Sequence, residues 1–464
     1  MADTDIVCIS PVDGREFVRR PIMTDAAVEA AIATAREAQK SWRAVPLAER
    51  QALTLRALDE LMAMNQEVVP ELAQMMGRPV RFGGEFRGVE ERTRHMVRIA
   101  QDSLADMPPD DERPGFRRVI KREPLGLVLV VAPWNYPYLT AINTIVPALV
   151  AGNAVLLKHA SQTILAGERF QAAMDRAGLP RGVFQNLTLS HDQTSRILGN
   201  GLVDHCNFTG SVTGGRAIER AAAGSFTSLG LELGGKDPAY VRADADIAHA
   251  IENVVDGAFF NSGQCCCGIE RIYVHESRYD AFVEGAVELV RGYRLGNPLD
   301  EATNLGPMAH RRFADLVRRQ TAEAVAAGAT AHIDTKTFSA DTGDSAYLAP
   351  QVLTGVTHAM SVMRDESFGP VVGIMKVADD EEAVRLMNDS PYGLSAAIWT
   401  SDVEAAERLG ERLETGTVFM NRADYLDPGL AWTGVKDTGR GASLSRLGYL
   451  SVTRPKSYHL RQLA

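Results

Sequence analysis

The stretch Leu125-Gly-Leu-Val-Leu-Val-Val-Ala132 decides the fold class of this 464-residue chain. An almost unbroken apolar run is typical of a strand that is buried on both faces, as the strands of parallel sheets are. After it, residues 138–233 alternate between predicted helices and short strands. Repeated units of this kind predict a parallel, doubly wound α/β sheet, and such sheets bind ligands at the carboxyl ends of their strands.

The segments around this core differ in pattern. Residues 24–100 show helical periodicity, with Thr24 as a plausible N-cap, and the polar, proline-rich segment 107–115 is typical of a linker. A second region of alternating strands and helices runs from about residue 244 to 420, and residues 450–460 are expected to be extended. The length of the chain also favours at least two domains.

Composition excludes several classes of protein. A hydrophobic content of 45% and a charged content of 23% are ordinary for a globular protein. No transmembrane span or signal peptide is indicated, and the five cysteines agree with a reducing compartment, so we expect a cytoplasmic protein. The net charge of −10 argues against nucleic acid as a partner.

Three of the five cysteines are consecutive, at positions 265–267 within the segment 259–268. Zinc sites need cysteine pairs that are spaced by two to four residues, and neighbouring cysteines fit disulfide geometry poorly, so we expect no metal site and no bridge. Two interpretations remain open at this point: a small apolar plug in a core, or one reactive thiol between two bystanders.

Four polar features are predicted at the carboxyl edge of the sheet. Residues 208–215 close a strand and open a helix with a glycine-rich turn, which offers free N–H groups to a phosphate but matches neither the dinucleotide fingerprint nor a P-loop. Lys158 ends a second strand, Asn135 follows the first, and Glu232 ends the last. Glutamate is rarely buried unless it is paired or functional, so Glu232 is a candidate for chemistry.

Together, six motifs resemble the aldehyde dehydrogenase superfamily over nearly the whole chain, and their order makes the resemblance specific. They are Pro133-Trp134-Asn135, the strand end at Lys158, Phe208-Thr209-Gly210-Ser211, Leu231-Glu232-Leu233-Gly234-Gly235-Lys236, Asn261-x-Gly263-Gln264-x-Cys266 and Glu366-Ser367-Phe368-Gly369-Pro370. The runs from Lys158 to Thr163 are similar to those of succinate-semialdehyde dehydrogenase relatives.

The resemblance implies oxidation of an aldehyde to its acid with NAD(P)+. Cys266 is the implied nucleophile, and Glu232 is the general base that takes its proton and later activates water. The Asn135 amide and the Cys266 backbone N–H are the implied oxyanion donors, each typically worth about 3 to 4 kcal/mol. Cys265 and Cys267 are then bystanders. A semialdehyde such as succinate semialdehyde is the candidate substrate.

The resemblance also implies a set of cofactor-binding residues. They are Trp134, Lys158, Ser161, Gly210, Ser211, Gly215, Glu366 and Phe368. Many members have a Glu where this chain has Ser161, and that Glu grips the adenosine ribose hydroxyls. A carboxylate would repel a 2′-phosphate, whereas Ser161 beside Lys158 can accept one. We therefore expect either NAD or NADP as cofactor, with NADP tolerated and a candidate for the preferred one. His159 is expected to be an ordinary packed residue.

A second departure from the family pattern is paired. A Lys that is common in the family is Thr144 here, and the C-terminal run 434–444 has no Glu. Losing both together avoids an unpaired buried charge, so we expect no auxiliary proton path and assign the base role to Glu232 alone. Residues expected to line the aldehyde passage are Tyr136, Leu139, Thr140, Asn143, Phe260, Tyr425 and Leu426, with Arg422 as a candidate for a substrate carboxylate.

The resemblance divides the chain into functional parts. Residues 1–107 and 125–233 are expected to form the Rossmann-like cofactor-binding domain and residues 234–436 a second α/β catalytic domain. Residues 108–124 and 437–464 are expected to form a small β oligomerisation element of a homodimer or homotetramer. Three other readings stay open: a CoA-acylating dehydrogenase, a thiol esterase or hydrolase, and a non-catalytic protein. The presence of Glu232 argues against the first, and the nucleotide features argue against the second.

Overall fold

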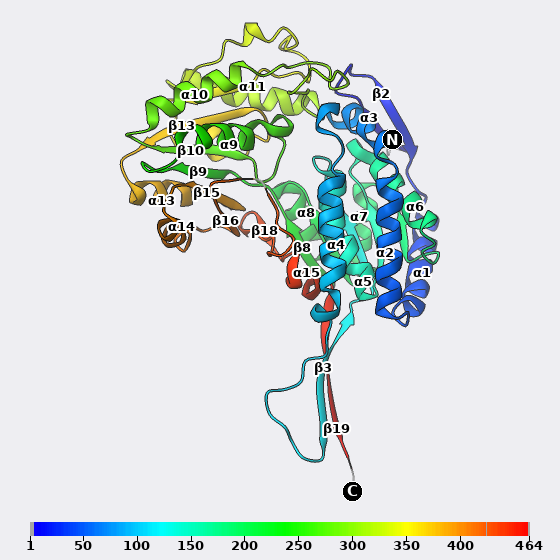
Figure 1. Cartoon of the computed structure of the whole chain (residues 1–464). Helices are drawn as coiled ribbons and strands as arrows, with labels where there is room; N and C mark the ends of the chain where they lie inside the picture. Colours follow the sequence, from blue (N-terminus) through cyan, green and yellow to red (C-terminus); the bar gives the residue numbers. More distant parts are fainter. Residues whose placement is uncertain (1–3, 424, 463–464) are drawn as a thin grey trace.

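The computed structural model describes residues 4–423 and 425–462. They form two α/β bodies that lie side by side, with a two-stranded ribbon that projects away from them (Figure 1). The α/β class with a parallel, doubly wound sheet is as the sequence predicts. None of the helices in the described ranges is long and apolar enough to cross a membrane.

The first body is built on a six-stranded sheet in the order β18-β8-β7-β4-β5-β6. Its strands are β4 (Leu127–Val131), β5 (Ala154–Lys158), β6 (Phe184–Asn186), β7 (His205–Thr209), β8 (Ser228–Glu232) and β18 (Gly439–Arg440). All neighbours are parallel except β18, which runs antiparallel to β8. The chain passes from β4 outward through β5 and β6, then returns to β7 on the other side of β4. The switch point between β4 and β7 is where such sheets bind ligands.

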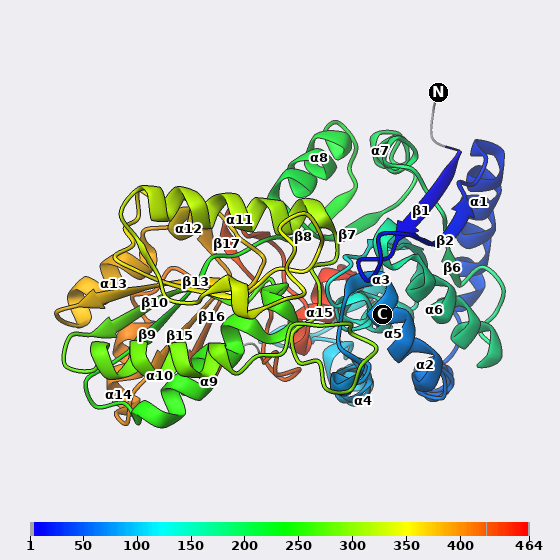
Figure 2. The same cartoon turned by 90° about the horizontal axis from the view of Figure 1, so that it is seen from above.

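Helices cover both faces of this sheet (Figure 2). Val128 and Val130 pack among α2 (Leu47–Met62), α3 (Asn65–Met76), α4 (Phe86–Ser103), α5 (Pro137–Ala151) and α6 (Ile164–Arg176). Leu127 and Leu129 pack on the other face with α1 (Asp25–Trp42), α7 (His191–Gly199) and α8 (Val212–Ala222). Because alternate residues of β4 enter two different cores, its sequence has to be apolar throughout.

The second body is built on a seven-stranded sheet in the order β11-β12-β13-β10-β9-β15-β16. Its strands are β9 (Asp237–Val241), β10 (Ile269–His275), β11 (Thr330–Ala331), β12 (Gln351–Thr354), β13 (Val371–Val377), β15 (Ser395–Trp399) and β16 (Thr417–Met420). Its helices are α9 (Ile247–Phe259), α10 (Tyr279–Arg291), α11 (Arg311–Ala326), α12 (Ser361–Arg364), α13 (Asp380–Asn388) and α14 (Val403–Gly410). The segments that precede β9, β10 and β13 carry the site, so the amino edge of this sheet meets the carboxyl edge of the first.

The remaining elements are small. β1 (Asp5–Ile9) and β2 (Glu16–Pro21) form a hairpin, and β14 (Tyr392–Gly393) pairs with β17 (Val435–Lys436). Short 3₁₀ turns lie at η1 (Val80–Phe82), η2 (Ser161–Thr163), η3 (Phe260–Gly263) and η4 (Thr335–Thr337). The ribbon consists of β3 (Phe116–Pro124) and β19 (Thr453–Arg461), which are antiparallel along their whole length.

Three details differ from the sequence prediction. The predicted strands do not include β9, although it lies in the middle of the second sheet. Residues 450 and 451 are not extended but end α15 (Ser445–Ser451), and the extended segment starts at Thr453. Gly439 and Arg440 pair with β8 in the six-stranded sheet rather than with the ribbon.

Candidate active site

The cysteine triplet follows a tight left-handed turn at the end of α9. Asn261 and Ser262 have φ angles of 53° and 58°, and Gly263 has 71°. Such angles are uncommon for residues with a side chain and indicate local strain. The turn is held by the Ser262 hydroxyl, which donates to the Gly306 carbonyl (2.8 Å), and by Gln264, which donates to the Asn261 carbonyl (3.1 Å). The following residues therefore have a defined position.

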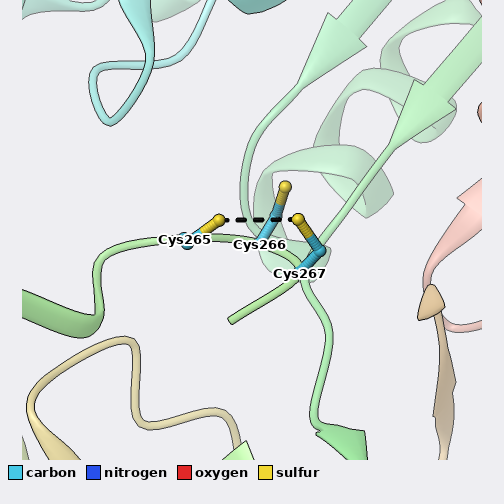
Figure 3. A group of neighbouring side chains, drawn as sticks. All are labelled: Cys265, Cys266 and Cys267. Atoms are coloured by element: carbon cyan, nitrogen blue, oxygen red, sulfur yellow. Dashed lines mark hydrogen bonds between the residues drawn. The ribbon is translucent and has the colours of Figure 1, made fainter. Parts of the chain in front are cut away.

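The Cys265 and Cys267 thiols point toward each other, whereas the Cys266 thiol points away from the line between them (Figure 3), and the three sulfur atoms lie within 4.8 Å of one another. Cys265 and Cys267 are buried, with 3.5 Å between their sulfurs, whereas Cys266 is half-buried. Contact with Cys265 and burial raise the pKa of Cys266, while donation from Cys266 and Cys267 lowers the pKa of Cys265. Cys266 is thus the accessible sulfur and depends on a base to become a thiolate.

The loop that carries Asn135 is fixed from the N-terminal helices. Arg78 donates to the Asn135 carbonyl (3.1 Å) and forms an ion pair with Glu85 (3.1 Å), and both charged side chains are buried. The other carboxylate oxygen of Glu85 accepts from the backbone N–H groups of Tyr138 (3.0 Å) and Leu139 (2.7 Å), at the start of α5. Glu85 thereby caps the helix that follows Asn135.

The same arginine connects this loop to the cysteine turn. Arg78 Nε donates to Asn261 Oδ1 (3.4 Å), and Asn261 Nδ2 lies 3.4 Å from the Asn135 carbonyl. Among the described residues, the side-chain amide of Asn135 and the backbone N–H of Cys266 make no hydrogen bond. Both donors are available to an oxygen atom of a ligand.

Glu232 ends β8 directly before the glycine-rich crossing into the second body. Burial raises the pKa of Glu232, against a weaker opposing effect of Thr209, whose hydroxyl lies 3.4 Å from the carboxylate. Gly439 pairs with Glu232 across the sheet and fixes its backbone. Gly235, three residues later, touches the Cys266 loop: a Cβ there would lie 2.5 Å from the Cys266 carbonyl oxygen. The structure thus brings the segments of Cys266, Glu232 and Asn135 together.

A cavity of about 470 Å³ lies beside these segments. The first residues of α8 line one wall, and residues from α11, α12 and the loop before β13, including Glu366, line the other. Ser211 is the N-cap of α8 and accepts from Gly214 N–H (3.2 Å). A helix N-terminus that opens into a cavity suits a phosphate, so this part of the cleft fits a dinucleotide.

The glycines of this turn have steric roles. Gly210 has no left-handed φ, but a Cβ at this position would lie 2.7 Å from the ring of Phe208. Gly215 packs against Leu233, where a Cβ would come within 2.5 Å of the side chain. Gly215 therefore brings α8 close to the β8 end, and a direct role of its backbone in cofactor binding stays a prediction.

Of the predicted nicotinamide-side residues, Glu366 lines this cavity, and Phe368 lies two residues further along the same loop. The rings of Trp134 and Phe368 are in edge contact, with centroids 5.5 Å apart. Glu270 accepts from the backbone N–H groups of Ser367 (2.8 Å) and Phe368 (2.9 Å), and Lys236 is its buried ion-pair partner. Burial and the nearby Glu270 raise the pKa of Glu366 to about 8. This arrangement holds the loop from 366 to 368 at the edge of the cavity.

Lys158 ends β5, and Ser161 begins the 3₁₀ turn η2 that follows this strand. Lys158 is buried, its side-chain ammonium makes no hydrogen bond with any described residue, and burial lowers its pKa to about 8. The charge on Lys158 lowers the pKa of His191, which begins α7. His159 is buried and packed, with its ring nitrogens 3.1 Å from the Pro137 carbonyl and 3.2 Å from the Thr163 hydroxyl.

Several residues of this site were not identified from the sequence. Arg78 and Glu85 lie in a charged, helical part of the chain, where charges usually mark a solvated face. His191 carries no motif. Gly77, which precedes Arg78, has a φ of 81° and packs against Pro307. This glycine is the one sequence feature that could have drawn attention to Arg78. Arg422 is exposed and stacks on the ring of Tyr425, 3.9 Å from its centroid.

Comparison with known proteins gives consistent results. The model of the aldehyde dehydrogenase family matches residues 1–458. A succinate-semialdehyde dehydrogenase [NADP(+)] of Mycolicibacterium paratuberculosis is 34% identical over 455 residues, which cover 97% of this chain and 96% of that protein. Succinate semialdehyde dehydrogenase [NAD(P)+] Sad of Escherichia coli is 32% identical, with 96% of each chain covered. The structure of an NADP-dependent glyceraldehyde-3-phosphate dehydrogenase from Bacillus halodurans, complexed with NADP, has a TM-score of 0.92 at 32% identity and covers 99% of this chain and 96% of that one.

The Arg78–Glu85 pair yields a test of how the site is held. The substitution Glu85→Ala leaves the Arg78 charge buried without its partner and removes the cap of α5. We expect a loss of about 3 to 5 kcal/mol in stability, measured as a lower midpoint of urea unfolding, and a lower kcat because the Asn135 loop shifts.

The matched control is Glu90→Ala on the same helix, which removes an exposed pair with Arg94. We expect a change of at most about 0.5 kcal/mol for this variant. Equal midpoints for the two variants would contradict the role given to Glu85.

Proposed function

Because this chain belongs to the aldehyde dehydrogenase family and is an NAD(P)-dependent aldehyde dehydrogenase, we propose that it oxidises an aldehyde to its acid through a covalent intermediate on Cys266. The observation that supports this most directly is the position of that thiol. It is the accessible member of the triplet, it follows a turn bonded to the Asn135 loop, and it lies against the crossing after Glu232.

The proposed reaction begins at Cys266. Glu232 takes the thiol proton, and the thiolate attacks the aldehyde carbon to form a C–S bond. The resulting oxyanion accepts hydrogen bonds from the Asn135 amide and the Cys266 N–H, both of which lack a partner among the described residues. NAD(P)+, when bound, supplies the acceptor for the hydride that leaves the same carbon. A thioester on Cys266 remains.

Hydrolysis then releases the product. Glu232 first releases the thiol proton to solvent. It then takes a proton from a water molecule, the resulting hydroxide attacks the thioester carbon, and the C–S bond breaks to leave the acid and the Cys266 thiolate. A carboxylate whose pKa is raised by burial is suited to accept and return protons near neutral pH. We propose no second acid–base pair, because the buried Thr144 of α5 carries no charge.

The cofactor residues support binding of NADP as well as NAD. The α8 N-terminus and Ser211 would face the pyrophosphate, and Glu366 with Phe368 and Trp134 would hold the nicotinamide end. The ammonium group of Lys158, which has no hydrogen-bond partner among the described residues, and Ser161 would bind a 2′-phosphate. His191, whose pKa responds to the charge of Lys158, adds a further polar group near this position.

Succinate semialdehyde is the proposed substrate. Two relatives that share about a third of their residues with this chain are named for it. The passage to Cys266 would be lined by Leu139 and Asn143 of α5 and by Phe260, which contacts Phe82 with ring centroids 5.0 Å apart.

We also propose a division of labour between the bodies and a homo-oligomeric state. The six-stranded body would bind the cofactor, and the seven-stranded body would supply the nucleophile. The β3–β19 ribbon projects from the six-stranded body (Figure 1), and an isolated pair of strands is marginally stable in water. A second copy of the chain would cover it. Sedimentation equilibrium should give a mass of two or four times 50.3 kDa, and a mass of one chain at micromolar concentration would contradict this proposal.

The role of Cys266 is tested by replacing each thiol in turn. We expect Cys266→Ala to abolish NADPH formation at 340 nm with succinate semialdehyde, and Cys265→Ala and Cys267→Ala to retain most of it, because only Cys266 is accessible. Formation of acid without added CoA would separate hydrolysis from acyl transfer. Activity of Cys266→Ala within tenfold of the parent would overturn the proposal.

The role of Glu232 is tested by pH and by substitution. Because burial raises the pKa of Glu232 above the usual 4.5, kcat should fall on the acid side at a pH above 4.5, where the carboxylate becomes protonated. Glu232→Gln should lower kcat by about 10² to 10⁴. Substantial turnover by this variant would contradict the assignment of the base.

The cofactor assignment predicts a pH-dependent preference. The lowered pKa of Lys158, about 8, means that its charge is present below that pH and lost above it. Binding of NADP should therefore weaken about tenfold relative to NAD between about pH 7 and about pH 9, measured by fluorescence titration of both cofactors. Lys158→Met should remove this dependence, and a pH-independent ratio in the parent enzyme would show that Lys158 does not bind the 2′-phosphate.

A further inference from the structure

Arg92 on α4 is a buried arginine that the chain leaves only partly satisfied. Its exposed fraction is 8%, yet all its hydrogen bonds to described residues come from Nη1: one to the Leu139 carbonyl (3.1 Å) and one to Asn143 Oδ1 (3.3 Å). No carboxylate of the described residues forms an ion pair with it. Burying a charge without a partner costs free energy, so this arrangement calls for an explanation.

The other buried arginines show how a guanidinium with a structural role is hydrogen-bonded in this protein. Arg78 pairs with Glu85 and donates from all three of its nitrogens. Arg271 donates to backbone carbonyls from Nε, Nη1 and Nη2. Arg50 uses Nε and Nη1 for three carbonyls. Only Arg92, among the described buried arginines, leaves both Nε and Nη2 without a partner.

These two nitrogens are not sealed inside the protein. They are absent from the buried polar atoms that lack a partner in the described chain, so they reach accessible space. Nε and Nη2 form one edge of the guanidinium, and this edge can donate two parallel hydrogen bonds to a carboxylate. The part of Arg92 that the protein leaves open is therefore a bidentate anion-binding edge.

The position of this edge connects it to the reaction. Leu139 and Asn143, which fix Nη1, lie one turn apart on α5, the helix that starts directly after Asn135. Burial lowers the pKa of Arg92, and negative charge at nearby groups opposes that shift: Cys267, Glu85, Glu232 and Cys266. Arg92 is thus near the nucleophile and on the side of α5 that the sequence assigns to the aldehyde passage.

We propose that Arg92 binds a carboxylate at the end of the substrate opposite the aldehyde, so that the enzyme selects short aldehydes that carry a carboxylate. This inference rests on the proposed aldehyde oxidation. The guanidinium supplies the charge and the open fork, and Asn143 with the Leu139 carbonyl fixes its orientation. Arg422, the arginine favoured by the sequence, is exposed and stacked on Tyr425, and it is not bonded to α5. Selection by charge would thus come from α4.

The test compares two four-carbon aldehydes, succinate semialdehyde and uncharged butanal, by the ratio of their kcat/KM values. The parent enzyme should favour the semialdehyde strongly. Arg92→Gln should lower that ratio at least about 50-fold, mainly through KM, because a buried charge pair is lost. Arg92→Lys should give an intermediate ratio, because a point charge cannot form the fork. The control Arg422→Gln should change the ratio less than twofold.

Each other outcome overturns the proposal. Equal loss of both substrates in Arg92→Gln would make Arg92 a structural residue or a partner of Glu232. A low ratio in the parent enzyme would show that the enzyme does not select by charge. A loss of the ratio in Arg422→Gln, and not in Arg92→Gln, would assign charge selection to Arg422. In all of these cases oxidation of butanal by the parent enzyme would leave the dehydrogenase function standing.

Inhibition by succinate gives a readout that does not depend on the folding of Arg92→Gln. Succinate should compete with the semialdehyde in the parent enzyme and at least about tenfold more weakly in Arg92→Lys. Thermal unfolding and NADP binding would first verify that the lysine variant is folded. Equal inhibition constants in the two enzymes would contradict the role of Arg92.

Discussion

The buried ion pair between Arg78 and Glu85 is the constraint on which the site depends. Arg78 bonds to the Asn135 carbonyl and to the Asn261 side chain, and Glu85 caps α5. One pair of charges therefore sets the relative position of the amide loop, the cysteine turn and a helix of the passage. A buried charge tolerates little displacement from its partner, because each lost contact leaves a desolvated group. The N-terminal helices, which contribute nothing to the sheets, fix the geometry in this way.

A second buried pair performs the same task for the cofactor side. Lys236 follows the glycine-rich crossing and pairs with Glu270, at the start of β10, and Glu270 holds the backbone of Ser367 and Phe368. The crossing, a strand and the loop that carries Glu366 are thereby tied together. The fixed charges pair with each other, whereas Lys158 and Arg92 remain without a carboxylate among the described residues. Unpaired cations beside open space are the groups that select anionic ligands.

Most of the fold and the convergence of the candidate site residues could be predicted, because strand ends in a doubly wound sheet converge. Asn135, Lys158 and Glu232 follow or end predicted strands, so their placement at one edge needed no tertiary information. β9 escaped prediction because Pro238 lacks the N–H of a central strand, and the pairing with β10 shifts register beside it. Arg78 and Glu85, which lie between α3 and α4, and Arg92 on α4 escaped because the sequence does not reveal whether a charged side chain is solvated. Their burial depends on how α4 packs against α5.

The meeting of the two sheet edges requires close backbone approaches that side chains would prevent. At Gly235 the Cys266 carbonyl occupies the space of a Cβ, and at Gly263, with φ of 71°, the Gly369 carbonyl lies 2.4 Å from that position. The first contact brings the segment after Glu232 against the Cys266 backbone, and the second brings the turn before Cys266 against the loop that carries Glu366 and Phe368. Chain segments that are far apart in sequence can therefore share one small site only because these two positions have no side chain. The chemistry then comes from the residues beside each glycine.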